Sequence, residues 1–522
     1  MNQLIADLER SLPAYISSRR WFRAKTRTIR QVEIEDLIEA PGFLILVICI
    51  HYQDAASDEY LLPVAIAWDT KEHKDAIGSV RDENGGREGV AYDALLDAQV
   101  HNALLEAVEN ERKFEGRAGA LCATHTPAFA KLLPLSGALS DSFVSRAEQS
   151  NTSIIYPDKF IFKLFRKLEP GVNPDVEIGR FLTSRGFRHT PAVYGSLTYQ
   201  RRSDAAEHSA GILQQFVANR GDAWKYTLES LSEFFKRVLA GSSTLPPEVP
   251  AQHPLDLAQR EAPSDVRALL GEYYGSARLL GTRTAEMHIA LADSNGGPDF
   301  APEPFTAADA RYLYEETSAQ AVSGFDALRR MLPAMSPAAA ADARAVLERE
   351  PQIFERLEAL RNTSSTGAVR IRHHGDYHLG QVLYTGHDFM IIDFEGEPAR
   401  PLTERRAKTL AMRDVAGMLR SFQYAAYAVL FGQVPGISPA SAESHRVEGW
   451  SAFWNAWISA AFLQTYLDRA ASCSFLSPEP AARRLMLGAF LLQKAVYEIS
   501  YELNNRPDWV RIPLRGILSL VA

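Results

Sequence analysis

Residues 372–395, RHHGDYHLGQVLYTGHDFMIIDFE, constrain the fold of this chain more than any other segment. An H-G-D triplet there ends in Asp376 on a predicted turn, and an amide, Gln381, follows five positions later. The apolar run 389–392 predicts a short strand, and a second aspartate, Asp393, comes directly after it. The segment therefore presents a turn carboxylate, an amide and a strand-end carboxylate within a short stretch of chain.

This spacing is typical of a phosphoryl-transfer loop followed by a metal-binding segment. Such a transfer needs a carboxylate that orients the attacking hydroxyl and accepts its proton, together with Mg²⁺ that neutralises phosphate charge. Mg²⁺ prefers oxygen ligands. We therefore predict ATP and Mg²⁺ as cofactors, Asp376 as the catalytic base, and three metal ligands, Gln381, Asp393 and Glu395. Taken alone, each part is ordinary, because H-G-D is a common loop sequence and an aspartate after a strand often only forms a turn.

Two departures from the protein-kinase pattern bear on the acceptor. Gln381 stands where many kinases carry asparagine, and its side chain offers the same amide oxygen on a longer arm. Glu395 takes the place of the glycine in the Asp-Phe-Gly triplet of protein kinases. The segment therefore favours a kinase of small molecules over a protein kinase.

Composition excludes several kinds of partner and site. The net charge of −8 disfavours nucleic acid and anionic membranes as partners. The three cysteines form no C-x-x-C pair, so they support neither a disulfide framework nor a zinc site. The start, MNQLIADLER, lacks the apolar region of a signal peptide, and no apolar run is long enough to span a bilayer. We expect a cytoplasmic enzyme.

A chain of 522 residues is too long for one core, and its patterns divide it into three parts. The first, residues 1–110, predicts a small α+β cap subdomain with a helix at 2–17, strands at 31–38, 42–52 and 59–68, and a helix at 91–110. Residues 111–217 are β-rich and would complete an N-lobe, with a hairpin at 154–165, a helix at 176–185 and a strand at 211–217. Residues 218–522 form the helical C-lobe, with patterns at 224–240, 264–293, 306–332, 337–361, 404–432, 445–470 and 480–504. This order predicts an α+β, bilobal, kinase-like fold.

The predicted hairpin supplies the nucleotide half of the site. Lys163 lies in its second strand, and Glu177 follows in the next helix, as in the lysine–glutamate pair that holds ATP phosphates in kinases. Lys163 also fits a solvent-facing edge strand, Arg166 and Lys167 are rival cations, and a helix glutamate is common on any surface. We further predict phosphate contacts from Gln149, Ser150, Asn151, Thr152 and Ser153, and adenine contacts from the hinge residues Gln215 and Val217.

Several segments together resemble those of bacterial maltokinases, which occur alone or fused to trehalose synthase. The most specific are EQSNTSIIYPDKFIFKLFRKLEPGVNPDVEIGRFL (148–182) and the catalytic stretch HHGDYHLGQVLY with IIDFEGEP (373–398). RRWFRAKTR (19–27), NRGDAWKYTL (219–228) and YELNNRPDWVRIPLRG (501–516) extend the resemblance over essentially the whole chain. The resemblance implies an aminoglycoside-phosphotransferase-like bilobal fold with a cystatin-like N-terminal cap. It also implies ATP-dependent phosphorylation of maltose to maltose 1-phosphate for α-glucan (glycogen) synthesis, with trehalose synthase as an associated protein.

A disaccharide needs polar groups for its hydroxyls and aromatic rings for its apolar faces. The last predicted helix offers both, and the catalytic loop adds two more candidates. We expect substrate contacts from Tyr377, His378, Tyr497, Glu498, Tyr501, Glu502 and Arg506. The same helix also fits an ordinary amphipathic element with a solvated face. Asp414, in the helix after the metal segment, is expected to secure the backbone of the catalytic loop.

Three interpretations of the chain stay open at this point. The first is an active maltokinase. The second is a related kinase of another sugar, amino sugar or aminoglycoside with the same catalytic residues. The third is a non-catalytic binding module that keeps the fold, against which the intact set of Lys163, Asp376, Gln381 and Asp393 argues.

Overall fold

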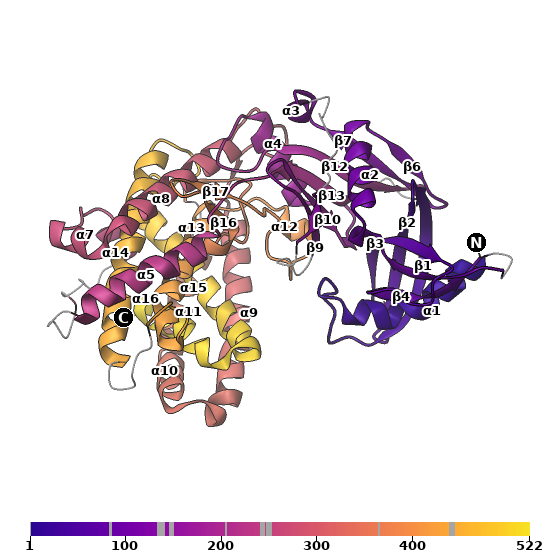
Figure 1. Cartoon of the computed structure of the whole chain (residues 1–522). Coiled ribbons are helices and arrows are strands. Elements are labelled where there is room, and N and C mark those ends of the chain that lie inside the picture. The colour runs from indigo at the N-terminus through magenta and orange to yellow at the C-terminus, as the bar shows by residue number, and fades with distance from the viewer. Residues whose placement is uncertain are drawn as a thin grey trace. The chain divides into compact units, whose positions relative to one another are not determined.

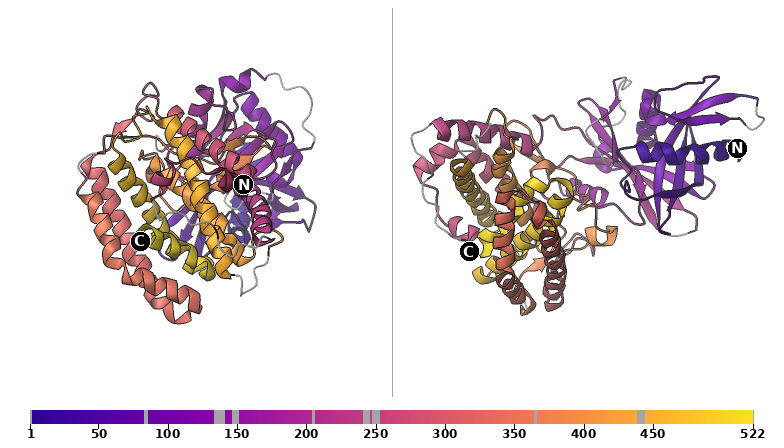
Figure 2. Two further views of the ribbon diagram at one scale, coloured as in Figure 1. Left: turned by 90° about the vertical axis from the view of Figure 1, so that its left-hand side faces the viewer. Right: turned by 90° about the horizontal axis from the view of Figure 1, so that it is seen from below.

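The computed structural model describes residues 2–82, 86–132, 141–145, 151–203, 206–240, 246, 253–363, 366–437 and 444–521. The chain forms two compact units, Met1–Ala218 and Asn219–Ala522. The first is mainly strands and the second mainly helices, as the sequence predicts (Figure 1; further views in Figure 2). Among the described residues, no helix combines the length and apolar character that crossing a bilayer requires.

The first sheet of the N-terminal unit is antiparallel, with strand order β1-β2-β3-β5-β4. Its strands are β1 (Ile29–Ala40), β2 (Phe43–Tyr52), β3 (Ser57–Trp68), β4 (Ala76–Arg81) and β5 (Glu88–Asp93), and β11 (Lys167–Leu168) pairs with β3. Helix α1 (Asn2–Ser18) packs on this sheet through Leu8, Leu12 and Ile16, which are fully buried among strand side chains. Burial of one apolar helix stripe against one sheet face explains why this segment is helical.

The predicted helix at 91–110 begins too early. Residues 88–93 form β5, which pairs with both β3 and β4, and α2 (Ala98–Glu109) starts only after a short 3₁₀ turn at Ala94–Leu96. The carboxylate of Asp93 caps that turn by accepting a hydrogen bond from the backbone N–H of Leu95. Pairing on both sides of the strand, which a sequence window does not reveal, decides this boundary.

The second sheet has the order β6-β7-β12-β13-β10-β9-β8. Its strands are β6 (Lys113–Glu115), β7 (Gly119–His125), β8 (Phe143–Val144), β9 (Asn151–Tyr156), β10 (Phe160–Phe165), β12 (Val193–Arg201) and β13 (Glu207–Gln215). One core joins both sheets to α2, with Val47, Leu104 and Leu121 among its members. The short helix α3 (Pro127–Ala130) contacts β12, and α4 (Pro174–Ser184) packs against β12 and β13.

The predicted hairpin at 154–165 is confirmed as β9 and β10, with Lys163 opposite Ser153 on one side and Ile212 on the other. The strand predicted at 211–217 is β13, which begins four residues earlier and ends at Gln215. Val217 therefore lies beyond the strand, as expected for a connecting segment.

The second unit is built from helices. They are α5 (Ala223–Ala240), α6 (Pro254–Leu257), α7 (Ser264–Leu270), α8 (Glu272–Leu291), α9 (Ala307–Met331), α10 (Pro337–Glu348), α11 (Glu350–Arg361), α12 (Leu402–Arg405), α13 (Met412–Tyr427), α14 (Ser444–Ala470), α15 (Pro480–Asn505) and α16 (Arg511–Val521). Strands are few and short: β14 (Glu303–Pro304) pairs with β15 (Val369–Arg370), and β16 (Val382–Tyr384) pairs with β17 (Phe389–Ile391).

Three predicted helices are each interrupted, and α16 lies outside the predicted set. The pattern at 264–293 breaks at Gly271, whose φ of 67° suits glycine and ends α7. The pattern at 337–361 breaks between α10 and α11, where Pro351 stands in the first turn of the new helix. The pattern at 404–432 separates into α12 and α13. Apolar periodicity alone did not register these breaks.

Candidate active site

The hairpin β16–β17 brings the two best metal-ligand candidates together. Val382 pairs with Ile391, so Gln381 and Asp393 stand next to each other at one end of the hairpin. The Gln381 Nε2 donates a 2.8 Å hydrogen bond to Asp393 Oδ2. Asp393 has a φ of 66°, a conformation that is uncommon outside glycine and often marks functional sites. The third candidate, Glu395, is buried two residues further along the same segment.

The loop that carries the H-G-D triplet approaches this segment closely at Gly375, where a side chain would be strained. Its φ is 87°, and a Cβ on Gly375 would lie 3.1 Å from the Cα of Gly396. The loop is also close to α13, because a Cβ on Gly417 would lie 2.6 Å from the carbonyl oxygen of Tyr377. The residue after Gly375 is Asp376, which lines a pocket.

Asp414, at the start of α13, holds the loop backbone as expected. Its Oδ2 accepts a 2.7 Å hydrogen bond from the His374 N–H, and its Oδ1 accepts a 3.0 Å bond from the Gly375 N–H. His288 Nε2 lies 3.0 Å from the same Oδ2, and the other ring nitrogen of His288 lies 3.0 Å from the Tyr466 hydroxyl. Burial alone would raise the pKa of Asp414, but its bond to His288 and the nearby histidines hold that pKa well below its usual range.

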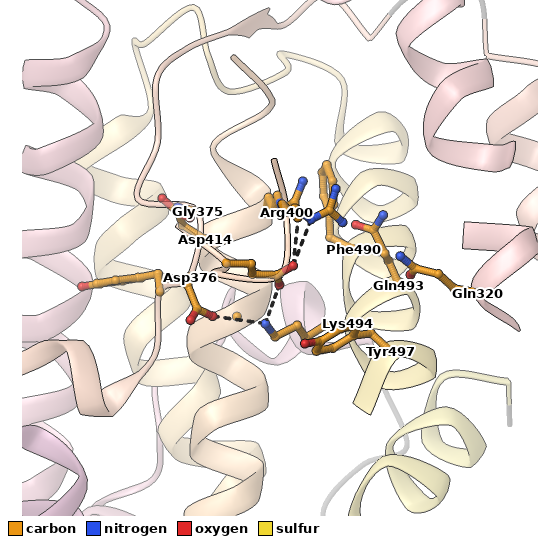
Figure 3. Close-up of a pocket in the computed structure, with 13 residues that line it drawn as sticks. Gln320, Gly375, Asp376, Arg400, Asp414, Phe490, Gln493, Lys494 and Tyr497 are labelled. Carbon is orange, nitrogen blue, oxygen red and sulfur yellow. Dashed lines mark hydrogen bonds and ion pairs between the residues drawn. The ribbon is translucent and has the colours of Figure 1, made fainter. Parts of the chain in front are cut away.

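Asp376 faces a cation from the penultimate helix. Lys494, on α15, places its Nζ 3.3 Å from Asp376 Oδ1 and 2.8 Å from Glu397 Oε1 (Figure 3). Arg400 Nε donates a 3.0 Å hydrogen bond to Glu397 Oε2, and a guanidinium nitrogen of Arg413 lies 3.9 Å from that oxygen. Burial would raise the pKa of Glu397, but Lys494, Arg413 and Arg400 lower it to about 2. The pocket therefore contains a network of ionised side chains, in which carboxylates face lysine and arginine.

The pocket belongs entirely to the second unit and mixes polar groups with three aromatic residues, Tyr377, Phe490 and Tyr497. In the side-chain arrangement of this structure its cavity volume is about 30 Å³. Glu397, Arg400 and Gly375 come from the loops, and Gln493, Lys494 and Tyr497 come from α15, so neighbouring turns of one helix build one wall. Its lining residues are Gln320, Gly375, Asp376, Tyr377, Glu397, Arg400, Arg413, Asp414, Gly417, Phe490, Gln493, Lys494 and Tyr497.

The predicted sugar contacts occupy different environments. Tyr377 and Tyr497 line the pocket, although the Tyr377 hydroxyl is buried 2.9 Å from the Thr284 hydroxyl. His378 Nε2 lies 3.8 Å from Asp376 Oδ2. Tyr501 is 46% exposed on the outer side of α15.

The predicted carboxylates of α15 are held by cations. Glu498 is buried and accepts a 3.0 Å hydrogen bond from Arg420 Nε, and Glu502 is buried and accepts bonds from Arg506 and the Tyr424 hydroxyl. These three predicted contacts, Glu498, Glu502 and Arg506, therefore lie in structural networks of this conformation. Their role toward a substrate stays a prediction.

In the N-terminal unit, Lys163 is buried in β10 and pairs with Asp175 in the first turn of α4, with its Nζ 3.4 Å from Asp175 Oδ2. The sequence argument named Glu177 as the partner, two residues further along the same helix, and that pairing stays a prediction. Asp175 is the missed residue, because a lysine and a helix carboxylate can pair at more than one register. Rival cation Arg166 is buried against Asp93 and Thr152 instead.

The remaining nucleotide candidates lie along β9 and at the end of β13. Asn151, Thr152 and Ser153 are buried in β9, and Thr152 Oγ1 accepts a 2.8 Å hydrogen bond from Arg166 Nε. Gln149 and Ser150 lie outside the described residues. The backbone N–H of Gln215 donates to the carbonyl of Ala192, and the backbone of Val217 follows two residues later. Their contacts with adenine stay predictions.

Sequence reasoning left several pocket residues without a predicted role. Glu397 lies two residues beyond the predicted metal ligand Glu395, in the sequence Gly-Glu-Pro, which by itself indicates no function. Lys494 lies on the helix that is expected to contact the sugar, but nothing in the sequence joins it to Asp376, 118 positions away. The pocket residues without a predicted role are Gln320, Glu397, Arg400, Arg413, Gly417, Phe490, Gln493 and Lys494.

Comparison with known proteins identifies the cap and the fold. Residues 15–97 match the family described as the maltokinase N-terminal cap domain. The chain is 25% identical over 378 residues to a glucosamine kinase of Mycolicibacterium smegmatis, covering 72% of this chain and 78% of that protein. It is 26% identical over 381 residues to a glucosamine kinase of Streptacidiphilus jiangxiensis, covering 72% of each.

A solved structure extends the likeness to the whole chain. A glucosamine kinase in complex with glucosamine, ADP and inorganic phosphate matches 99% of each chain with a TM-score of 0.63 at 19% identity. At that identity the likeness shows the fold. The predicted fold class is confirmed: a mixed α+β, bilobal, kinase-like fold with a β-rich N-terminal cap.

Proposed function

We propose that this chain, which has the aminoglycoside-phosphotransferase-like kinase fold, is an ATP-dependent sugar kinase that converts maltose to maltose 1-phosphate. The observation that carries the proposal is that Asp376 lies in a pocket lined by hydrogen-bonding groups and aromatic rings, directly after Gly375, which approaches Gly396 in the segment that follows the metal-ligand candidate Asp393. Such a lining suits a sugar, whose hydroxyls need donors and acceptors and whose ring faces need apolar cover.

The proposed chemistry assigns one task to each group. Asp376 accepts the proton of the acceptor hydroxyl as its oxygen attacks the γ-phosphorus of ATP, and ADP leaves. Lys163, paired with Asp175, is the cation for the nucleotide phosphates, as the strand lysine is in kinases. Asp414 holds the loop backbone so that Asp376 is presented in one orientation.

The donor set beside Asp376 fits Mg²⁺. Gln381 and Asp393 offer amide and carboxylate oxygens from adjacent positions, and no softer ligand type is among them. Gln381, Asp393 and Glu395 would hold the ion, which when bound with ATP neutralises charge on the phosphates. The hydrogen bond from Gln381 fixes the orientation of the Asp393 carboxylate before any ion arrives.

Maltose as the acceptor has separate support. The cap matches a domain described for maltokinases, and the chain resembles maltokinases in both its nucleotide and its catalytic segments. An anomeric hydroxyl is more acidic than other sugar hydroxyls, so a carboxylate, which is a weak base, suits transfer to the reducing end. A role in glycogen synthesis and an association with trehalose synthase stay predictions of the resemblance.

Glucosamine phosphorylation is the second candidate. The two curated relatives and the superposed structure are glucosamine kinases by name, although each is at most 26% identical to this chain. The charges of the pocket weigh against it, because Lys494 already neutralises the carboxylates that an amino sugar would need.

An acceptor screen tests the proposal. We would measure ADP release by the purified protein with ATP, Mg²⁺ and each of maltose, glucose, glucosamine and kanamycin, with Asp376→Asn as the enzyme control. We expect turnover with maltose that exceeds the others. Methyl maltoside and trehalose, which have no free anomeric hydroxyl, should be inert, and NMR of the product should place phosphate on the anomeric oxygen of maltose. Preferred turnover of glucosamine would replace maltose with the second candidate.

A further inference from the structure

Lys494 occupies an unusual position for a helix lysine. It lies on α15 in the pocket wall, and its side chain is only 26% exposed. Its ammonium contacts the catalytic-base candidate and Glu397 at the same time, and it lies 5.4 Å from the centre of the Tyr497 ring. In Figure 3 the side chain points from α15 into the pocket, toward the loop that carries Asp376. Moving a lysine ammonium out of water toward two carboxylates costs desolvation free energy, which an ordinary surface lysine does not incur.

The charges of the pocket cancel when Lys494 is counted. Three carboxylates, Asp376, Glu397 and Asp414, line it together with three cations, Arg400, Arg413 and Lys494. Both oxygens of Glu397 are engaged, Oε1 by Lys494 and Oε2 by Arg400. Although burial lowers the pKa of Lys494, the two carboxylates raise it well above its usual range, so the ammonium form persists.

We propose that Lys494 is a charge-selectivity residue that admits neutral sugars and rejects acceptors that carry an ammonium group. Its own ammonium already occupies the carboxylates that would bind a cationic acceptor. A sugar hydroxyl can accept a hydrogen bond from Lys494, whereas a second ammonium brings a like charge into a partly desolvated site whose carboxylates Asp376 and Glu397 already face cations. The inference rests on the proposed sugar-kinase function, and it explains why a chain related to glucosamine kinases would act on a neutral acceptor.

Two substitutions separate the charge of Lys494 from its bulk. Lys494→Met removes the charge and keeps the length of the side chain, and Lys494→Arg keeps the charge. Lys236→Met is the matched control, because Lys236 pairs with Glu233 on the exposed side of α5, outside the pocket. Each variant is compared with the wild type by kcat/KM for glucose and glucosamine, and for maltose and 2-amino-2-deoxymaltose, at a pH where the amines are protonated.

The quantity to follow is the ratio of kcat/KM for the amino sugar to that for its neutral partner. In Lys494→Met we expect this ratio to rise at least tenfold, which corresponds to about 1.4 kcal/mol. In Lys494→Arg and Lys236→Met we expect it to stay within about threefold of the wild-type ratio. If Lys494→Met is folded but turns over too slowly, isothermal titration with the same sugar pairs gives the ratio from Kd values. If thermal melting shows that Lys494→Met is unfolded, Lys494→Gln replaces this variant.

The outcomes distinguish this inference from the function on which it rests. Transfer of phosphate to maltose by the wild type, with an unchanged ratio in Lys494→Met, overturns the inference alone. A wild type that prefers the amino sugar of either pair also overturns it. A wild type that phosphorylates none of these sugars overturns the proposed function, whatever the binding ratio does.

Discussion

The carboxylate of Asp414 accepts a 2.7 Å hydrogen bond from the backbone N–H of His374, forty positions earlier in the chain. The same carboxylate also serves Gly375 and His288, and Asp414 is 1% exposed. One buried side chain therefore fixes the loop that carries Asp376. Its role is to hold the loop backbone, because both of its carboxylate oxygens accept hydrogen bonds from backbone N–H groups of the loop.

Asp414→Asn should destabilise the protein and lower kcat together. An asparagine keeps the shape but turns an NH₂ group toward one of the N–H donors, which leaves a buried donor unpaired and removes the charge that His288 faces. We expect a loss of about 2–4 kcal/mol in the free energy of unfolding, measured by urea titration. Asp326→Asn, which breaks an exposed pair with Arg329, should change it by less than about 0.5 kcal/mol. Equal effects of the two variants would contradict this role.

Asp376→Asn should nearly abolish turnover while leaving ATP binding close to normal. The amide keeps the size of the side chain but cannot accept the hydroxyl proton, and loss of a general base typically costs a factor of about 10²–10⁴ in rate. Steady-state kcat and the Kd for ATP, from titration calorimetry, check the two halves of the statement. Turnover at the wild-type level would remove Asp376 from the role of base.

Asp393→Ala should lose Mg²⁺-dependent activity, and added Mg²⁺ should restore little of it. The alanine removes a charged ligand and leaves the Gln381 amide without its 2.8 Å acceptor. Activity is measured as a function of Mg²⁺ concentration at fixed ATP. Asp326→Ala, on the exposed surface of α9, serves as the control and should keep the wild-type curve. An unchanged Mg²⁺ curve in Asp393→Ala would show that the ligand assignment is wrong.

Stability should fall with acidification through a buried histidine of the catalytic loop. Burial lowers the pKa of His373 from 6.5 to about 3. The unfolded chain therefore binds a proton between these pH values that the folded protein does not. The contribution of His373 is complete above pH 6.5 and is lost as pH falls toward 3, at up to about 1.4 kcal/mol per pH unit.

Denaturant titrations between pH 4 and pH 7 check this dependence. His373→Leu should flatten it, because leucine does not titrate. His387→Gln, at an exposed position, should leave the slope as it is in the wild type. A slope that is identical in wild type and His373→Leu would contradict the assignment.

The sequence by itself determined the features whose parts are close together along the chain. The Lys163 hairpin and the Gln381–Asp393 pair could be predicted because a short turn leaves neighbouring strands few ways to pair. The H-G-D glycine could be predicted to form a turn, and the structure adds that a Cβ there would lie only 3.1 Å from the Cα of Gly396. The fold class followed from the order of strand-rich and helix-rich segments.

Only the tertiary structure decided which side chains meet across long separations. Periodicity places Lys494 on a face of α15, but it does not say that this face opposes Asp376, because the packing of α13 and the loops sets that contact. For the same reason the pairing of Lys163 with Asp175 could not be predicted, since it depends on how α4 packs on its sheet. Sequence spacing determines contacts between residues that are close along the chain. Packing of distant elements determines which charged side chains meet, and here those pairs underlie the proposed choice of substrate.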